Sequence, residues 1–297
     1  MEVFSSSKLK KNKIDLFYIV VFIVLTLWAI VILYPFYNAI LISLVPQIDY
    51  TKNPFMLFPK RISLSSYELL FHGKRLLVGY KTTMFILLLG IPLNMLLTTC
   101  TAYPLSRKIF PGKSVLFPLI IFTMFFSGGI IPLYLVIKGI GLTNNIWSIV
   151  LVSGINTFYL ILVKNYFESI PESIEESAKI DGANDISIFF NIILPLSKPI
   201  LATVFLFYMV DRWNEWFYSM IFLRSRNWMP LQVILRNIIF ESTVDDLAGS
   251  GTSLRQEVFS EGIKMAAITL TMTPIMIIYP FLQKHFVKGI MLGSVKS

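Results

Sequence analysis

The residues best placed to do chemistry are three charged side chains inside an otherwise apolar stretch. Asp211, Arg212 and Glu215 lie near the middle of residues 199–223, a segment long enough to cross a bilayer. A charge at membrane depth costs about 2.5–3.5 kcal/mol on insertion scales, so such residues are expected to face a cavity or a partner. Asp211 and Glu215 are four residues apart and share one helix face, and Arg212 and Glu215 are three apart.

Two interpretations of this charged cluster remain open. In the first, the side chains form a polar lining along a path through the membrane. In the second, they neutralise one another and fix the packing between subunits.

The composition indicates a polytopic membrane protein. Of 297 residues, 55% are hydrophobic and only 14% are charged, which is far from the balance of a soluble domain. Five long runs contain no Asp, Glu, Lys or Arg, and the sixth is the segment with the three charges. We therefore predict an all-α fold in one transmembrane domain over residues 1–297, with six spans at about 16–40, 80–103, 115–137, 146–166, 199–223 and 264–283.

Catalytic and metal chemistry are poorly supported. Cys100 is the only cysteine and lies inside a predicted span, and His72 and His285 are far apart in the sequence. No glycine-rich phosphate loop followed by Lys and Ser or Thr occurs, so this chain is not expected to hydrolyse ATP. The net charge of +9 is spread along the chain, which favours anionic lipid over nucleic acid as its partner.

The orientation rests on the first predicted span. Lysines cluster just before it, which places the N-terminus in the cytoplasm, and six spans return the C-terminus to the same side. The cluster consists of Lys8, Lys10, Lys11 and Lys13. Two outer loops follow, 45–80 and 224–264, and we expect both to be irregular because of Pro54, Pro59 and the 249–251 Gly-Ser-Gly stretch.

Residues 169–195, on the predicted inner side, carry their own helix signals. Ser169 is expected to cap a helix, Pro171 is tolerated in a first turn, and Glu172 sits where a capping box needs an acid. Gly182 is expected to end this helix, because glycine accepts the left-handed conformation of a C-terminal cap. A second apolar turn, 186–193, follows. The pattern predicts a short helix, a glycine bend and a second short helix.

The faces of the first short helix suggest an amphipathic element. The apolar side is expected to hold Ile174, Ala178 and Ile180, and the polar side Glu175, Glu176 and Lys179. Physical chemistry alone leaves two roles open. The helix either lies passively at the membrane surface or docks a cytoplasmic partner.

The spacing within this segment resembles the signature of ABC-importer permeases. Glu176-Ser177-Ala178 precedes Gly182, and Ile192 and Leu194-Pro195 follow in register, with Ser177 where the family has alanine. The resemblance implies that 169–195 is a cytoplasmic coupling segment between spans four and five, whose helix docks on an ATPase. The coupling residues that it implies are Glu172, Glu175, Glu176, Ser177, Ala178, Asp181, Gly182 and Ala183.

The resemblance extends over nearly the whole chain. The segments 102–107, 129–134, 141–147, 213–215 and 279–296 are similar to the carbohydrate-importer branch, and in particular to the smaller maltose-type permease subunit. The last segment looks most like a subgroup that handles complex oligosaccharides, including uronic-acid-containing ones. The implied partners are a second homologous permease, an ATPase dimer that binds ATP and Mg²⁺, and an extracytoplasmic solute-binding protein, all at a bacterial cytoplasmic membrane. No cofactor is implied in this chain.

For such a transporter, the charged cluster becomes a candidate substrate path. Sugar hydroxyls bind Asp, Asn and Arg side chains, ring faces stack on aromatic residues, and Arg212 could receive the carboxylate of an acidic sugar. The candidates are Asp211, Arg212, Trp213, Asn214, Glu215, Trp216 and Tyr218, together with Asn94, Asn156 and Tyr159 on other spans. The last three could equally be hydrogen-bonding groups between helices.

Two other functions compete with this interpretation. A proton-coupled carrier could use Asp211 and Glu215 as a relay, although no inverted repeat is evident. A membrane-embedded enzyme would need a nucleophile and base or a metal site, for which the sequence offers no constellation. Dependence of uptake on ATP rather than on a proton gradient separates a pump from a carrier.

Overall fold

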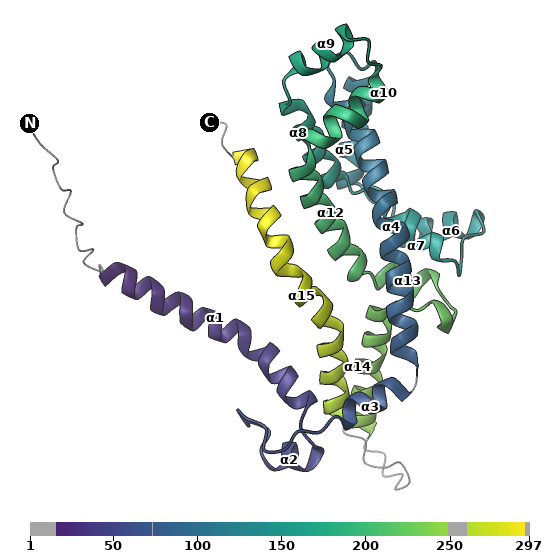
Figure 1. The fold of residues 1–297 in the computed structure, drawn as a ribbon. Helices are drawn as coiled ribbons and strands as arrows, with labels where there is room; N and C mark the ends of the chain where they lie inside the picture. The colour runs from purple at the N-terminus through teal and green to yellow at the C-terminus, as the bar shows by residue number, and fades with distance from the viewer. Residues whose placement is uncertain (1–15, 73, 249–259, 295–297) are drawn as a thin grey trace, which may run out of the picture.

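The protein is described by a computed structural model that covers residues 16–72, 74–248 and 260–294 (Figure 1). Every regular element in these ranges is a helix, which confirms the all-α prediction. The α-helices are α1 Leu16–Ser43, α2 Gln47–Lys52, α3 Ser65–His72, α4 Arg75–Ser106, α5 Lys113–Phe125, α6 Ile130–Gly139, α7 Ile146–Val152, α8 Thr157–Ser169, α9 Glu172–Ile180, α10 Asp185–Ile188, α11 Leu194–Leu196, α12 Lys198–Trp213, α13 Phe217–Phe222, α14 Leu231–Ala248 and α15 Ser260–Ser294. A π-helical turn, η1 (Phe189–Ile193), joins α10 to α11, and a short 3₁₀ turn, η2 (Arg226–Trp228), precedes α14.

Three helices among the described residues are long and apolar enough to cross a membrane alone: α1, α4 and the Ser260–Pro280 part of α15. Three further pairs qualify only as broken spans, and the total reaches six if each bent pair counts as one. These pairs are α5 with α6, bent by 115°, α7 with α8, bent by 50°, and residues 185–196 with α12, bent by 81°. The six-span count therefore stays a prediction.

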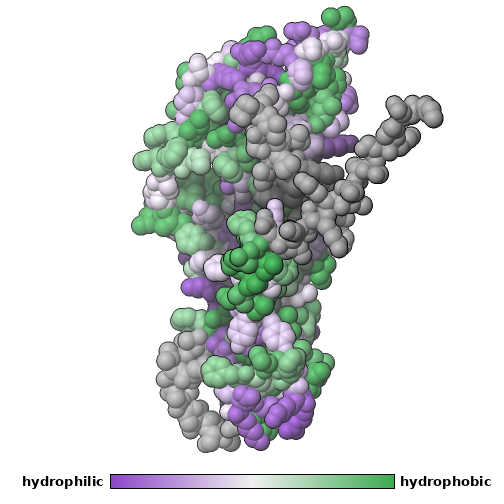
Figure 2. Space-filling model, turned by 90° about the vertical axis from the view of Figure 1, so that its left-hand side faces the viewer, coloured by the Kyte–Doolittle hydropathy of each residue, from purple (hydrophilic) through white to green (hydrophobic). Residues whose placement is uncertain are grey.

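The molecule is elongated, with polar material at its two ends. Helices α9 and α10 lie at one end, α2, α3 and α14 lie toward the other, and α4 runs between them (Figure 1). Helix α15 leads from the α3 end toward the α9 end (Figure 1). On the face that Figure 2 shows, hydrophilic side chains gather at the two ends, and the side chains drawn in colour between them are mainly hydrophobic. This distribution suits a protein that crosses a membrane along its long axis.

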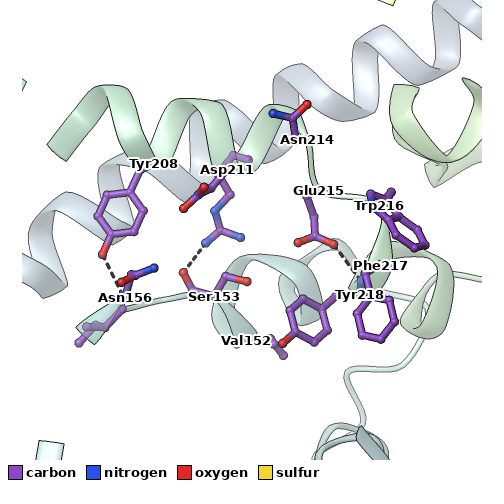
Figure 3. A pocket seen from close by; sticks show the side chains of 12 residues that line it. Val152, Ser153, Asn156, Tyr208, Asp211, Asn214, Glu215, Trp216, Phe217 and Tyr218 are labelled. Atoms are coloured by element: carbon purple, nitrogen blue, oxygen red, sulfur yellow. Dashed lines mark hydrogen bonds between the residues drawn. The ribbon is translucent and has the colours of Figure 1, made fainter. Parts of the chain in front are cut away.

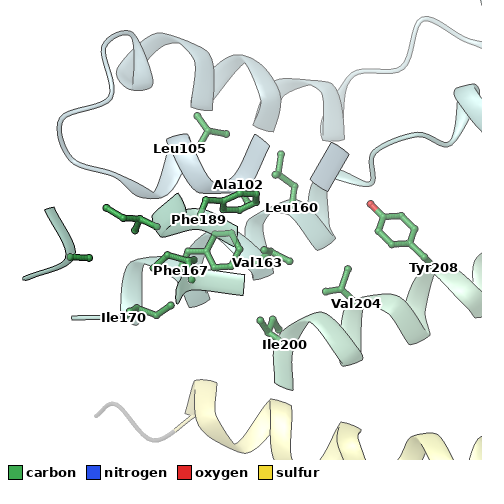
Figure 4. Packing of buried hydrophobic residues seen from close by; sticks show 13 residues of the cluster. Ala102, Leu105, Leu160, Val163, Phe167, Ile170, Phe189, Ile200, Val204 and Tyr208 are labelled. Atoms are coloured by element: carbon green, nitrogen blue, oxygen red, sulfur yellow. The ribbon is translucent and has the colours of Figure 1, made fainter. Parts of the chain in front are cut away.

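The largest apolar core joins the α9 end of the molecule to the membrane helices (Figure 4). Phe167 of α8 and Ile188 and Ile193 from the segment after Gly182 are fully buried there. They pack with residues of α4 and α12, such as Ala102 and Val204. Because dense apolar packing moves as a unit, the segment after Gly182 is attached firmly to the helix bundle.

Three of the predicted spans are interrupted. The third breaks at residues 126–129, where the chain carries the helix-weakening sequence Ser127-Gly128-Gly129. The fourth, predicted as one run over 146–166, is interrupted, because α7 ends at Val152 and α8 begins only at Thr157. The fifth, 199–223, is also not continuous, because α12 ends at Trp213 and a new helix begins at Phe217.

The outer segment 224–264 was expected to be irregular, and the structure contradicts this over its first half. Helix α14 occupies 231–248 and contacts both α4 and α15. Leu231 and Ile234 are buried, and the backbone N–H of Leu231 donates to Thr83 Oγ1 at 3.0 Å. Burial of this apolar face against two long helices makes the helix stable, which loop composition could not indicate. Residues 249–251 and the lysines at 8–13 lie outside the described residues.

Helix α1 stands largely apart from the rest of the bundle. Its side chains are exposed from Leu16 to Tyr37, and burial begins only at Ala39, where the helix meets α15. The exposed part is almost wholly apolar, as is required of a surface covered by lipid or by another membrane helix.

Candidate substrate cavity and coupling surface

Arg212 caps the end of α7, although it belongs to α12. Its Nη1 donates to the carbonyl of Ile149 at 2.8 Å, and its Nη2 donates to the carbonyls of Val150 and Ser153, both at 2.9 Å. The last carbonyls of a helix have no partner within that helix, and inside a membrane water cannot supply one. A guanidinium satisfies several of them at once, and its positive charge complements the negative end of the helix dipole.

Asn94 of α4 completes this arrangement. Its Nδ2 donates to the carbonyls of Ser153 and Gly154, at 2.6 and 2.7 Å, and its Oδ1 accepts a hydrogen bond from Arg212 Nε at 3.0 Å. Asn94 is fully buried and Arg212 is 2% exposed. Gly90 leaves the room that the guanidinium needs, since a Cβ there would lie 3.0 Å from Arg212 Nε. The chain break between α7 and α8 (residues 153–156) is thus held by side chains from two other helices.

This geometry changes the interpretation of the charged cluster. Arg212 makes four hydrogen bonds to protein groups, so few of its donors remain for a substrate. None of the ion pairs in the described part of the chain joins Arg212 to Asp211 or Glu215. The role expected for Arg212, to receive the carboxylate of a sugar, does not fit these contacts, and neither does a cluster held together by direct ion pairs.

Next to this break lies a cavity of about 440 Å³, called here the Asp211 cavity (Figure 3). Asp211, Asn214, Glu215 and Trp216 border it on one side and face Asn156 and Ser153 across it (Figure 3). Val152, Ile155, Tyr208, Arg212, Phe217 and Tyr218 complete the lining. Carboxylates, amides and aromatic rings that converge on one hollow suit hydrogen bonding to hydroxyl groups and stacking on a ring.

The two carboxylates of the cavity are held by different means. Asp211 Oδ2 accepts a hydrogen bond of 2.8 Å from the hydroxyl of Tyr159 on α8. Glu215 Oε1 accepts from the backbone N–H of Tyr218 at 2.9 Å and of Ser219 at 3.4 Å, so it caps the first turn of α13. Glu215 is therefore one cause of the interruption in the predicted fifth span.

Tyr208 of α12 fixes the side of the cavity that carries Asn156. Its hydroxyl accepts from the backbone N–H of Asn156 at 3.0 Å and lies 2.7 Å from Thr98 Oγ1. The Asn156 side chain in turn caps α8 by accepting from the N–H of Phe158 at 2.9 Å. These bonds set the position at which α8 restarts and hence the shape of the cavity.

The predicted path residues thus divide into three groups. Asp211, Asn214, Glu215, Trp216, Tyr218 and Asn156 line the cavity. Arg212 and Asn94 build its frame, and Tyr159 acts on it through Asp211. Trp213 points elsewhere, since it is 3% exposed and packs near Tyr80 in a separate apolar core.

Several lining residues escaped the sequence interpretation, namely Val152, Ser153, Ile155, Tyr208 and Phe217. The one available signal was Ser153-Gly154, a helix-weakening pair in the middle of an apolar run. Among the described residues, no three His, Cys, Asp or Glu side chains come together as metal ligands.

The helix, bend and helix predicted after α8 are present. α9 ends next to Gly182, whose φ of +84° lies in the left-handed region, and α10 follows. The predicted start of α9 is wrong in detail. Pro171 occupies the N-cap position, and the hydroxyl of Ser169 donates instead to the carbonyl of Tyr166 in the last turn of α8.

The faces of α9 also differ from the expected division. Glu175 and Ala178 are buried, whereas Ile180 is 86% exposed. Glu175 turns inward because Arg107 lies beneath it, with Oε1 and Nη2 2.7 Å apart in an ion pair. Burial raises the pKa of Glu175 above its ordinary value, although Arg107 acts in the opposite direction.

The outward face of this end combines acidic and apolar groups. Glu176, Ser177, Asp181 and Gly182 are exposed and Ala183 is partly so. Glu172 is also exposed and forms an ion pair of 2.9 Å with Lys108. Ile180 and Ile186, on either side of the bend, are 86% and 70% exposed. Apolar side chains that protrude from a polar end are typical of a contact surface.

Comparisons with known proteins support one family. Residues 77–292 match the family described as "Binding-protein-dependent transport system inner membrane component". The Bacillus subtilis (strain 168) proteins similar to this chain include Protein LplC, 41% identical over 264 residues and 89% of each chain. Another is the polygalacturonan/rhamnogalacturonan transport system permease protein YtcP, 40% identical over 97% of this chain and 100% of its own length.

A solved structure agrees with these matches. The chain is 34% identical to a subunit in the crystal structure of a bacterial ABC transporter involved in the import of the acidic polysaccharide alginate. The TM-score is 0.85, with 96% of this chain and 100% of that chain covered. The match over residues 77–292 and this agreement in fold lead to the conclusion that the chain belongs to the family of binding-protein-dependent transport system inner membrane components.

Proposed function

We propose that this permease is one membrane subunit of an ATP-driven importer of acidic oligosaccharides. The observation that carries the proposal is the agreement of two comparisons on substrate chemistry. One relative, aligned over 97% of this chain, is named for polygalacturonan and rhamnogalacturonan, and the similar solved structure is that of an alginate importer. All three polysaccharides contain uronic acids, so the shared substrate class is an oligosaccharide that bears carboxylates.

The α9 end is the proposed docking surface for the ATPase subunits, which bind ATP and Mg²⁺. Two observations support this role. Ile180 and Ile186 are exposed on either side of the Gly182 bend, and the segment after the bend is anchored in the largest core of the protein. A contact made at the exposed isoleucines can therefore be transmitted to α4, α8 and α12.

The proposed topology places the α9 end and both termini in the cytoplasm. Helix α15 supports this orientation, because it runs toward the α9 end as it approaches the C-terminus (Figure 1). A solute-binding protein would then deliver substrate at the opposite end, near α3 and α14. The bare apolar surface of α1 supports a second permease subunit as a partner within the bilayer.

The Asp211 cavity is the proposed stretch of the substrate path. Asp211, Asn214 and Asn156 offer hydrogen-bonding groups for hydroxyls, and Trp216 and Tyr218 offer ring faces. The breaks beside it, at 153–156 and 214–216, place it where helices can shift relative to one another.

Reconstitution of the complete complex tests the proposal. Proteoliposomes that contain this subunit, its partner permease and the ATPase, with binding protein outside, should accumulate oligogalacturonate when ATP is supplied within. Uptake should persist when the proton gradient is dissipated. Uptake that follows the proton gradient and not ATP would support a secondary carrier and overturn the proposal, as would uptake of neutral oligosaccharides alone.

A further inference from the structure

A second cavity adjoins the Asp211 cavity. Its lining includes Arg236, whose surroundings differ from those of Arg212. This Arg236 cavity measures about 380 Å³ and is lined by residues of α14 together with Trp216. Trp216 lines both cavities, and Gln232 Nε2 lies 3.4 Å from Asn214 Oδ1, so the two hollows meet at these residues. The remaining lining residues are Leu235, Arg236, Ile239 and Phe240.

The guanidinium of Arg236 is positioned by neighbouring side chains, and the contacts described for it leave hydrogen-bond donors available to a ligand. Its Cζ lies 5.3 Å from the centre of the Trp216 ring, in a cation–π contact. The one hydrogen bond that the structure describes for it runs from Nη1 to Met220 Sδ at 3.2 Å, and a thioether is a weak acceptor. Among the described ion pairs none involves Arg236, and its side chain is exposed.

The contrast with Arg212 indicates where a negative charge on the substrate can be neutralised. In the Asp211 cavity the guanidinium of Arg212 donates to backbone carbonyls, and the acidic side chains in the lining are the carboxylates Asp211 and Glu215. A uronate there would meet like charges. At the Arg236 cavity it would meet an accessible guanidinium, whose planar fork matches a carboxylate in two parallel hydrogen bonds.

We propose that Arg236 and Trp216 form a carboxylate-recognising subsite at the mouth of the substrate path, on the end away from α9. Arg236 pairs with the carboxylate of a uronic acid unit, the Trp216 ring stacks on the face of a sugar ring, and Gln232 serves its hydroxyls. The inference rests on the proposed function. It adds the step at which acidic substrate is distinguished from neutral substrate. The location fits this role, because α14 lies toward the end of the molecule opposite α9 (Figure 1).

The test compares one oligosaccharide with and without its charge. Trigalacturonate and its methyl ester are supplied to the reconstituted complex, and the KM for uptake is measured for wild type and for Arg236→Gln. Loss of a charge-assisted pair should raise the KM for trigalacturonate about tenfold. The KM for the uncharged ester should stay within about twofold, because the ester does not use the guanidinium as an ion partner.

Matched variants give the comparison its specificity. Arg224→Gln is the control, since Arg224 is also exposed but donates to the hydroxyl of Tyr134 outside both cavities, and it should change neither KM. Arg236→Lys keeps the charge without the fork and should fall between wild type and Arg236→Gln for the acid. Trp216→Leu should raise both KM values, because ring stacking serves acid and ester alike.

The outcomes separate this inference from the proposed function. If wild type imports trigalacturonate with ATP but Arg236→Gln alters neither KM, or raises both equally, the subsite is overturned while the function stands. If wild type imports the ester and other neutral oligosaccharides but not trigalacturonate, the proposed substrate class fails, and the subsite fails with it.

Discussion

Arg212 on α12 and Asn94 on α4 are 118 positions apart in the chain, yet a hydrogen bond of 3.0 Å joins their side chains across the broken end of α7. Between them they satisfy the carbonyls of Ile149, Val150, Ser153 and Gly154. A helix can stop inside a membrane only if its last carbonyls find donors, so this pair is the reason that α7 can end beside the cavity.

Arg212→Met should destabilise the subunit rather than impair transport selectively. The change leaves buried carbonyls without donors, and each unsatisfied group costs about 1–3 kcal/mol, so the thermal unfolding midpoint in detergent should fall markedly. Arg212→Lys should recover only part of the loss, because an ammonium cannot match the fork. A subunit that assembles with wild-type thermal stability but no longer transports would instead show that Arg212 contacts substrate.

Gly90→Val should reproduce part of the Arg212→Met defect from another helix. The new side chain would meet the guanidinium, since even a Cβ at this position lies 3.0 Å from Arg212 Nε. Its effect on the unfolding midpoint should therefore be smaller in an Arg212→Met background than in wild type. Gly139→Ala on α6 is the control, because nothing lies within 4 Å of its added Cβ. Strict additivity of Gly90→Val and Arg212→Met would contradict the shared mechanism.

Gly182→Val should weaken coupling to the ATPase through the backbone alone. The position has open space around it but a φ of +84°, a conformation that costs a residue with a Cβ about 1–2 kcal/mol. We expect the complex to insert while ATPase association and stimulated hydrolysis decline. Gly182→Asn, which tolerates the left-handed conformation, should be milder. Equal effects of Val and Asn would point to the exposed surface at this site rather than to the bend.

The stability of the α9 end should depend on pH through Glu175. Burial raises its folded-state pKa above the ordinary 4.5, so the folded state holds the proton more tightly than the unfolded state. The stability that this group contributes is fully present below pH 4.5 and is lost as pH rises through the raised folded pKa. The protection of the α9 amides against hydrogen exchange should therefore decrease as pH rises through this window, after correction for the intrinsic pH dependence of the exchange rate.

Glu175→Gln should remove that slope, whereas Glu176→Gln, an exposed neighbour on α9, should keep it. Arg107→Gln should widen the window, because Arg107 lowers the pKa of Glu175 and its loss raises that pKa further. An unchanged slope in Glu175→Gln would assign the pH dependence to another group.

Local patterns in the sequence were sufficient for the class of fold and for the helix, bend and helix that follow α8. Long uncharged runs require helices in a membrane, and Gly182 between two apolar-rich turns requires a bend, because both signals arise within a few residues of chain. The same local signals misjudged the buried side of α9, because Glu175 forms an ion pair with Arg107, which is far away in the chain, and this pair overrides the apolar periodicity.

Only the tertiary structure decided which polar residues line the Asp211 cavity. Asp211 and Arg212 are adjacent in the sequence, yet one is exposed to a cavity and the other is buried against the end of α7. The distinction depends on where α7 stops, which is set by donors from α4 and α12, and no window along the chain contains all three elements. Arg236 escaped notice for the same reason: its partner Trp216 and the cavity that they share exist only after α14 has packed against α4 and α15.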